Sequence, residues 1–202
     1  MLDSALLTAT AYFTGAIPTA YLVARYWRGV DIRAEGSGNV GAVNTFRAAG
    51  LWPGITVLLL DMAKGAAVMA LILALDLEPE GAFAAALAVT LGHNFSIFLR
   101  FRGGKGVAVV FGLSLVIFPV LTALALITLP IAWLLSRSIV WSFLVTFLVL
   151  NILIVATGQD ANDVGLCFTL SIIVVATHLW RNRIEVIEAL RRRDFVGMGK
   201  IE

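Results

Sequence analysis

Long apolar stretches, separated by short polar segments, run through most of the chain. A membrane-spanning helix needs roughly 20 apolar residues, and stretches of about that length recur with few charges inside them. The pattern therefore predicts an all-α fold built from transmembrane helices. The clearest candidates cover about residues 4–27, 53–75, 81–99, 139–157 and 163–180.

The apolar region 106–136 is harder to divide, because it carries no charge and is long for one span but short for two. Pro119 lies inside it, and we predict that the region breaks there into helices 106–118 and 119–136. At 1.5 Å per residue, the first of these reaches only about 20 Å across a hydrocarbon core of about 30 Å. We therefore expect a short or re-entrant helix at this place.

Basic residues indicate the topology, since Lys and Arg accumulate in the cytoplasmic loops of membrane proteins. They follow the first span, at 25–47, and the third, at 100–105, and they recur in the tail, at 181–200. The loops that would lie on the other side of the membrane carry acidic residues but neither Lys nor Arg. Two crossings within 106–136 place all these basic segments on one side, whereas one crossing does not. We predict a polytopic integral membrane helical bundle with seven transmembrane helices, the N-terminus outside and the C-terminus cytoplasmic.

Composition agrees with a membrane location. Of the 202 residues, 60% are hydrophobic and 14% charged, and the mean hydropathy is +0.95; soluble domains carry about a quarter charged residues. No polar segment is long enough to fold alone, so residues 1–202 are predicted to form a single membrane domain with a cytoplasmic tail, 181–202. Cys167 is the only cysteine, which excludes an intrachain disulfide and thiolate metal sites.

The two ends of the chain carry weaker signals. The N-terminal segment lacks the basic region of a secretory signal and stays apolar to about Tyr26, so we interpret it as the first span. In the tail, Ile184, Ile187 and Leu190 share one helical face among arginines, a pattern typical of an interfacial helix on an anionic leaflet. A solvated positive tail explains the same residues, and both hypotheses stay open.

Two glycine-rich segments fall in loops on the predicted cytoplasmic side: GSGNVGAVNTFR (36–47) and FRGGKG (101–106). Glycine lets the backbone approach a ligand, and successive amides can form an anion-binding nest. Arg47 adds a planar fork and Lys105 a point charge, both suited to phosphate. The spacing and context match neither a Walker loop nor a dinucleotide fingerprint. A turn or close packing would explain one such loop, but two on one side, each with a cation, favour a phosphate site.

Other polar residues converge on the same side. His93 lies about seven residues before the cytoplasmic end of its helix, and His178 closes the last span near Asn182. A structural role explains each histidine as well as ligand contact does. Asp61 and Lys64 lie one turn apart within the second span, where charged groups either pair or face a cavity. Self-neutralisation and help in holding a phosphate are both open for this pair.

Three segments in order along the chain, 36–47, 61–65 (DMAKG) and 92–107 (GHNFSIFLRFRGGKGV), resemble the bacterial acyl-phosphate:glycerol-3-phosphate acyltransferase family. The resemblance covers nearly the whole chain. It implies a seven-span enzyme of the bacterial inner membrane, with its active site facing the cytoplasm. That enzyme transfers an acyl chain from acyl phosphate to position 1 of glycerol 3-phosphate, giving lysophosphatidic acid and phosphate for phospholipid biosynthesis. Neither a metal, a cofactor nor a nucleic acid is implied.

The resemblance also implies roles for particular residues. Arg47 and Lys105 would hold phosphate oxygens, and His178 would approach the acceptor, which makes these three the candidate catalytic residues. Ser37, Gly38 and Asn39 would form a cradle for a phosphate. The full set of candidate substrate-binding residues is Gly36, Ser37, Gly38, Asn39, Asn44, Lys64, His93, Gly103, Gly104, Ser142 and Asn182. Asn44 is also expected to support the first loop.

The sequence departs from the family pattern at several positions. Val43 stands where the family has threonine, and Arg181 stands where it has asparagine, with Asn182 next. The family serine between the fifth and sixth spans falls near Val140, flanked by Ser138 and Ser142. These departures keep open the alternative of an acyltransferase with a different acceptor. A membrane transporter or binding protein for organic phosphates is the second alternative. Acyl-chain preference and oligomeric state are not predicted.

Overall fold

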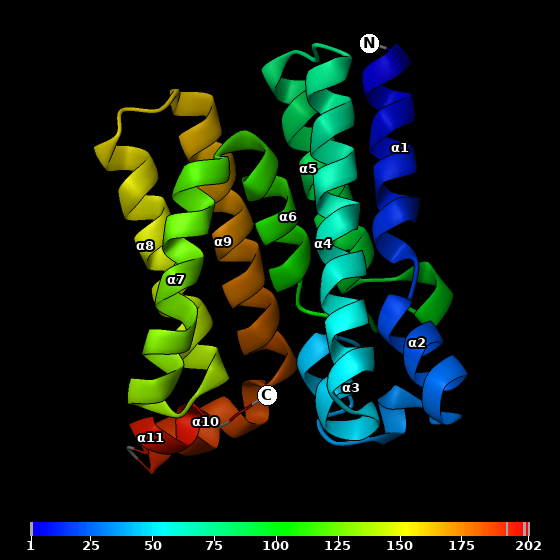
Figure 1. Cartoon of the computed structure of the whole chain (residues 1–202), viewed down its shortest axis with the longest axis vertical. Helices are drawn as coiled ribbons and strands as arrows, with labels where there is room; N and C mark the ends of the chain where they lie inside the picture. The colour runs from blue at the N-terminus through cyan, green and yellow to red at the C-terminus, as the bar shows by residue number, and fades with distance from the viewer. Residues whose placement is uncertain (1, 193, 200, 202) are drawn as a thin grey trace. The chain divides into compact units, whose positions relative to one another are not determined.

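The computed structural model describes residues 2–192, 194–199 and 201, and every regular element in them is a helix (Figure 1). The chain divides into two compact units, Met1–Ile117 and Phe118–Glu202. The single membrane domain expected from the sequence stays a prediction.

The first unit contains four longer helices that run side by side, with two short helices at one end (Figure 1). Helix α1 packs against α5, and α4 packs against α6, while α2 and α3 both contact α4. Its elements are α1 (Leu2–Ala16), α2 (Thr19–Arg28), η1 (Ile32–Ala34), α3 (Ala42–Ala49), α4 (Leu51–Ala74), α5 (Pro79–Asn94), η2 (Ile97–Leu99) and α6 (Val107–Ile117).

Glycines allow these helices to approach closely. A Cβ added at any of four helical glycines would overlap a backbone carbonyl of the partner helix. Small residues at such contacts are typical of helix pairs in membranes, where backbones gain dispersion contacts by close approach. The four are Gly15 and Gly92 between α1 and α5, and Gly65 and Gly112 between α4 and α6.

The first apolar stretch is not one continuous helix over 4–27, as expected, but breaks between α1 and α2. Pro18 causes the break, because its ring lacks an N–H and clashes with the preceding turn. A single backbone bond from Thr19 N to Ile17 O, 2.9 Å long, spans the corner. The break leaves the Ile17 carbonyl accessible to a side chain from another helix.

The second unit is a group of three long helices followed by two short ones (Figure 1). Ser138 and Asp160 cap the N-termini of α8 and α9 by accepting backbone N–H bonds. The expected break of the 106–136 region is present, because α6 ends at Ile117 and the next helix begins at Pro119. The elements are α7 (Pro119–Ser136), α8 (Ile139–Ala156), α9 (Ala161–Arg181), α10 (Arg183–Arg191) and α11 (Phe195–Met198).

Within the described residues, 6 helical segments are long and apolar enough to cross a membrane, counting α1 with α2 as one and α5 with η2 as one. Helix α6 has 11 residues and is shorter than these. The all-helical, polytopic membrane bundle is therefore confirmed. The count of seven crossings and their direction stay predictions.

Candidate functional site

Two glycine-rich loops lie in the first unit. Loop A (residues 35–41) leads from η1 to α3, and loop B (residues 100–106) leads from η2 to α6. Gly36 and Gly38 have φ angles of +53° and +67°, in the left-handed region that side-chain-bearing residues rarely adopt. Loop A therefore makes tight local turns that require glycine at these two positions.

The side chain of Asn44 holds loop A together from the first turn of α3. It is 3% exposed, and its Nδ2 donates to the carbonyls of Ile32 (3.2 Å), Glu35 (2.9 Å) and Asn39 (3.0 Å). Its Oδ1 accepts the backbone N–H of Ser37 at 3.2 Å. The support expected from Asn44 is thus visible as a set of contacts, and the amide donors are directed at the loop itself.

Loop B is attached to the C-terminal turn of α5. The N–H of Gly103 donates to the Asn94 carbonyl (3.1 Å), and the N–H of Gly104 donates to the His93 carbonyl (3.0 Å). An open nest of amides was expected here, but these two amides are occupied by protein carbonyls. The glycines instead permit close packing, since a Cβ on Gly103 would overlap the His93 carbonyl.

The two loops meet each other directly. A Cβ on Gly104 would lie 2.8 Å from the carbonyl oxygen of Val40 in loop A and would overlap Nε2 of His93. A small pocket opens at this meeting point, between the α1–α2 corner and loop B. Its volume of about 10 Å³ is near the least that holds one water molecule, so it does not admit a substrate in this conformation.

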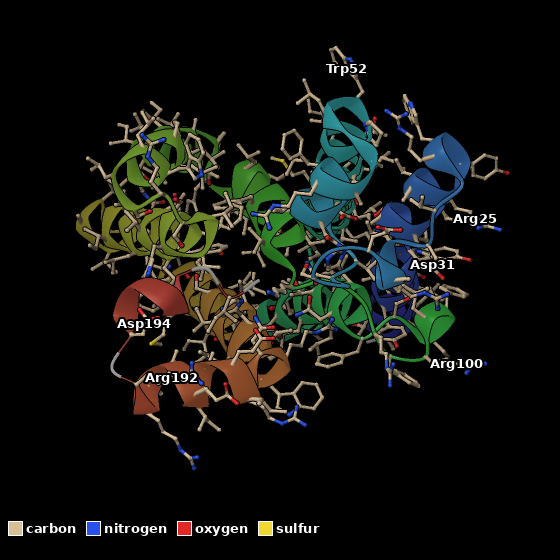
Figure 2. All side chains as sticks on the ribbon, turned by 90° about the horizontal axis from the view of Figure 1, so that it is seen from below. Arg25, Asp31, Trp52, Arg100, Arg192 and Asp194 are labelled. Carbon is tan, nitrogen blue, oxygen red and sulfur yellow. The ribbon has the colours of Figure 1, made fainter. Side chains whose placement is uncertain are left out.

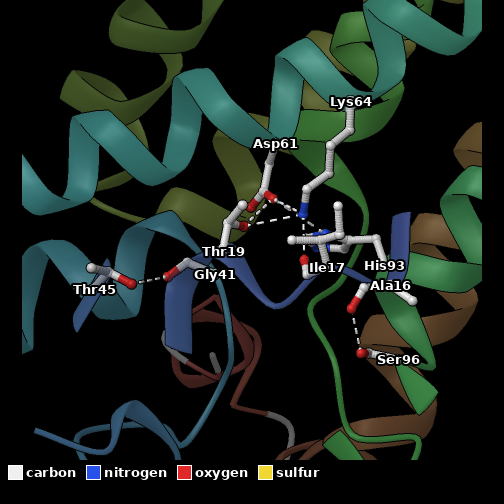
Figure 3. A network of polar contacts seen from close by, with 9 residues as sticks. All are labelled: Ala16, Ile17, Thr19, Gly41, Thr45, Asp61, Lys64, His93 and Ser96. Carbon is white, nitrogen blue, oxygen red and sulfur yellow. Dashed lines mark hydrogen bonds and ion pairs between the residues drawn. The ribbon is translucent and has the colours of Figure 1, made fainter. Parts of the chain in front are cut away.

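A buried polar network lies beside this pocket (Figure 3). Asp61 and Lys64 are 1% and 7% exposed, and both point from α4 toward the α1–α2 corner. Lys64 Nζ donates to the Ile17 carbonyl (2.6 Å), to Thr19 Oγ1 (3.2 Å) and to Asp61 Oδ1 (2.9 Å). The Thr19 hydroxyl donates to Asp61 Oδ1 at 2.5 Å. The predicted ion pair is therefore present, and its Lys64 satisfies the Ile17 carbonyl that the break at Pro18 leaves accessible.

His93 joins this network to loop B. Its Nδ1 lies 3.6 Å from Asp61 Oδ1, and the ring is almost fully buried. Nearby, the Ser96 hydroxyl donates to the Ala16 carbonyl at 2.5 Å, which connects the end of α5 to the end of α1. The structure thus brings His93, Lys64, Gly103 and Gly104 to one place.

The predicted cationic ligands lie nearer the surface. Arg47 is exposed in the last turn of α3, and Lys105 is half-buried directly after Gly104. In loop A, Ser37 is exposed and Asn39 is half-buried. Of these four candidates, Ser37 and Asn39 belong to loop A, Lys105 belongs to loop B, and Arg47 lies on α3, the helix that follows loop A.

Further charges surround this end of the first unit, and Figure 2 shows Arg25 and Arg100 extending outward from it. Asp31 pairs with Arg33, with a shortest N–O distance of 2.6 Å. This hydrogen bond lowers the pKa of Asp31 to about 2. The Asp31 carboxylate is therefore ionised at neutral pH and bound within its own turn.

The remaining candidates belong to the second unit. His178 Nδ1 and Asn182 Nδ2 are 3.3 Å apart at the end of α9. Ser142 is completely buried in α8, and its hydroxyl donates to the Ser138 carbonyl at 2.6 Å. Arg181, which replaces the family asparagine, is half-buried. In this conformation the hydroxyl proton of Ser142 is therefore donated within its own helix and not to a ligand.

Sequence reasoning missed Thr19 and Ser96 as members of the polar network. Thr19 follows Pro18 inside an apolar stretch, and this pair was a usable signal, because a proline corner exposes carbonyls that need donors. Ser96 gave no such signal, since its acceptor lies 80 positions away in the sequence. Within the described residues, no group of three or more His, Cys, Asp or Glu side chains is placed to hold a metal ion.

Fold and site together define a polytopic helical membrane protein with two anchored glycine-rich loops, exposed cations and a buried charge network in one unit. A family model described as glycerol-3-phosphate acyltransferase matches residues 5–191. Similar curated proteins include the glycerol-3-phosphate acyltransferase of Halalkalibacterium halodurans, 38% identical over 88% of this chain and 87% of the relative. A glycerol-3-phosphate acyltransferase of Thermus thermophilus is 41% identical over 83% of this chain and 84% of the relative.

Two crystal structures of PlsY (YgiH), an integral membrane glycerol 3-phosphate acyltransferase, share the fold. The glycerol 3-phosphate form is 27% identical and the lysophosphatidic acid form 26% identical, each with a TM-score of 0.82. Each match covers 94% of this chain and 92% of the other. The chain belongs to the glycerol-3-phosphate acyltransferase family, which confirms the resemblance found in the sequence.

Proposed function

We propose that this chain transfers the acyl group of an acyl phosphate to the 1-hydroxyl of glycerol 3-phosphate, forming lysophosphatidic acid and phosphate. Family membership over residues 5–191 carries the proposal. The likeness to PlsY in its glycerol 3-phosphate and lysophosphatidic acid forms supports the acceptor and the product. The acyl phosphate donor is supported by the sequence resemblance.

The reaction needs positioning more than activation, because an acyl phosphate is a mixed anhydride whose carbonyl already carries a good leaving group. The 1-hydroxyl oxygen forms a bond to the carbonyl carbon, the bond from that carbon to the phosphate oxygen breaks, and the hydroxyl proton passes to a base. Holding two reactants in attack geometry supplies about 7–11 kcal/mol, whereas a general base adds about 10²–10⁴-fold. A histidine or a substrate phosphate oxygen serves as that base.

Arg47 and Lys105 are proposed to bind the phosphate oxygens beside loops A and B. Both substrates are anionic, so cations at this place also offset their mutual repulsion. Ser37, Gly38 and Asn39 are proposed to line the cradle, and the exposed side chain of Ser37 supports this. The Ser37 and Gly38 amides, however, donate within the protein, so the cradle relies on side chains and cations rather than on these two amides.

We propose that His178 approaches the acceptor and that Asn182 binds substrate, as the sequence resemblance implies; the two side chains lie 3.3 Å apart. The chain is proposed to act as a single membrane domain with seven crossings. The six longer helical segments would make six of them, and the short helix α6 would make the other. The N-terminus would lie outside, and loops A and B would face the cytoplasm of a bacterial cell, at its inner membrane. The distribution of basic residues supports this orientation.

The test is acyl transfer by purified protein in detergent or lipid, with synthetic acyl phosphate and measured release of phosphate. Release that depends on glycerol 3-phosphate, with lysophosphatidic acid as product, is expected. Release that ignores glycerol 3-phosphate would indicate a different acceptor, a hypothesis that Arg181 motivates. No release at all would favour the alternative of an organic-phosphate transporter.

Two variants test the proposed ligands at matched amounts of folded protein. Arg47→Ala and Lys105→Ala should each reduce acyl transfer severely. Arg25→Ala is the matched control, since Arg25 is exposed and its Nη1 donates to the Gly29 carbonyl. Near-normal turnover in either ligand variant would contradict the assignment of that residue.

A further inference from the structure

The contacts of the buried charge pair of α4 favour one of the two roles that the sequence left open, self-neutralisation inside the protein. An ammonium group has three donors, and Lys64 Nζ directs them at three acceptors, the Ile17 carbonyl, Thr19 Oγ1 and Asp61 Oδ1. With Lys64 only 7% exposed, its donors are fully used inside the protein. Lys64 therefore does not bind a substrate phosphate in this conformation.

Asp61 is the centre of the network rather than a simple counter-ion. Its Oδ1 accepts from Lys64 (2.9 Å) and Thr19 (2.5 Å) and faces His93 Nδ1 at 3.6 Å (Figure 3). A carboxylate at this position attracts a proton on Nδ1, and this contact fixes the orientation of the His93 ring. The low local dielectric strengthens this orientation.

The other edge of the His93 ring touches loop B. A Cβ on Gly104 would overlap His93 Nε2, so the ring lies directly against the Gly104 backbone. The backbone of His93 also contributes, because its carbonyl accepts the Gly104 N–H at 3.0 Å. Gly104 in turn packs on the Val40 carbonyl of loop A. The imidazole ring therefore packs against the residue through which loop B contacts loop A.

We propose that Asp61 and Lys64 are positioning residues that act through His93. The carboxylate orients the imidazole ring, the ring supports Gly104, and Gly104 places Lys105 for binding a substrate phosphate. Lys64 neutralises Asp61 and fastens both to the carbonyl at the Pro18 corner. This inference rests on the proposed function, because it assigns the loop that Asp61 and Lys64 support to phosphate binding.

The test uses a charge-neutral double variant, Asp61→Asn/Lys64→Met, which removes both charges and leaves no unpaired ion buried. Steady-state kinetics are measured with each phosphate substrate varied in turn while the other is saturating, since either phosphate is chemically suited to loop B. We expect the KM of one of the two substrates to rise by up to about 100-fold, since a 1 Å misplacement can cost about that factor. The affected substrate identifies the phosphate held at loop B.

Two histidine variants separate positioning from general stability. His93→Gln keeps an amide near the Nε2 position against Gly104, whereas His93→Asn keeps one near Nδ1 and loses the contact with Gly104. The glutamine variant should retain a KM closer to that of the native chain than the asparagine variant does. Adding the double substitution to His93→Asn should raise the KM little further, because Asp61 acts through the missing contact.

The matched control removes an exposed pair, Glu188→Gln/Arg192→Met, whose charged atoms are 3.9 Å apart. It should leave both KM values unchanged. With an active native chain, two results would overturn the positioning role. One is unchanged KM values in the Asp61/Lys64 variant, and the other is a combined variant in which the effects of the double substitution and of His93→Asn on KM multiply. A native chain without acyl transfer would overturn the proposed function and this inference together.

Discussion

Asn44 is the residue on which the shape of loop A depends most directly. Its NH₂ group has two donors and its carbonyl accepts one N–H, so the contacts amount to three full hydrogen bonds. At about 1 kcal/mol net for each bond, they stabilise the ordered loop by about 3 kcal/mol. Because about 1.4 kcal/mol corresponds to a factor of ten, losing them should depopulate the ordered loop about 100-fold.

Asn44→Asp is the sharpest perturbation, because it preserves size but turns a carboxylate oxygen toward the carbonyls of Ile32, Glu35 and Asn39. We expect kcat/KM for acyl transfer to fall by up to about 100-fold, since the loop must be ordered before it binds phosphate. Trypsin cleavage after the exposed Arg33 should accelerate as the loop opens.

The control for this experiment is Asn162→Ala, which removes an exposed asparagine side chain from the first turn of α9. It should change neither kcat/KM nor the rate of cleavage after Arg33. If Asn44→Asp retained native kcat/KM and native resistance to trypsin, the claim that Asn44 holds loop A would be refuted.

Three further predictions follow from contacts in the first unit. Gly104→Ala should strongly reduce acyl transfer while the protein remains folded, because a Cβ there displaces loop B; kinetics on protein that passes size exclusion would check this, and native activity would contradict it. Gly65→Leu should lower the thermal unfolding temperature, because the side chain would push α4 away from the Val109 carbonyl; an unchanged temperature would show that the helices are not in close contact. Arg33→Ala should raise the pKa of Asp31 from about 2 toward 3.8 in an NMR titration. With Arg33 present, the pair contributes stability above pH 4 that is lost as the pH falls toward 2, and a titration unaltered by the substitution would exclude the pair as the cause.

The sequence alone was enough for the class of fold. Apolar stretches as long as a bilayer is thick have few other uses, so the helices could be placed to within a few residues; the predicted span 119–136 coincides with α7 (Pro119–Ser136). Pro18 was visible in the sequence, but its effect was underestimated. A proline within an apolar stretch is compatible with both a kinked and a broken helix, and in the broken form found here Lys64 of α4 donates to the Ile17 carbonyl and to Thr19.

The sequence also identified the family and the candidate residues, because two loops rich in glycine, each with a cation, are suited to binding phosphate. What only the tertiary structure decided is how their donors and acceptors are used. Local sequence shows that Gly103, Gly104 and Lys64 can bind an anion, since amides and ammonium groups are donors in any context. Whether those donors are available depends on carbonyls from distant segments, such as His93 and Ile17, that folding brings to them. Hydrogen bonds are satisfied by whichever acceptor lies within about 3 Å, and that distance is set by packing between helices rather than by order along the chain.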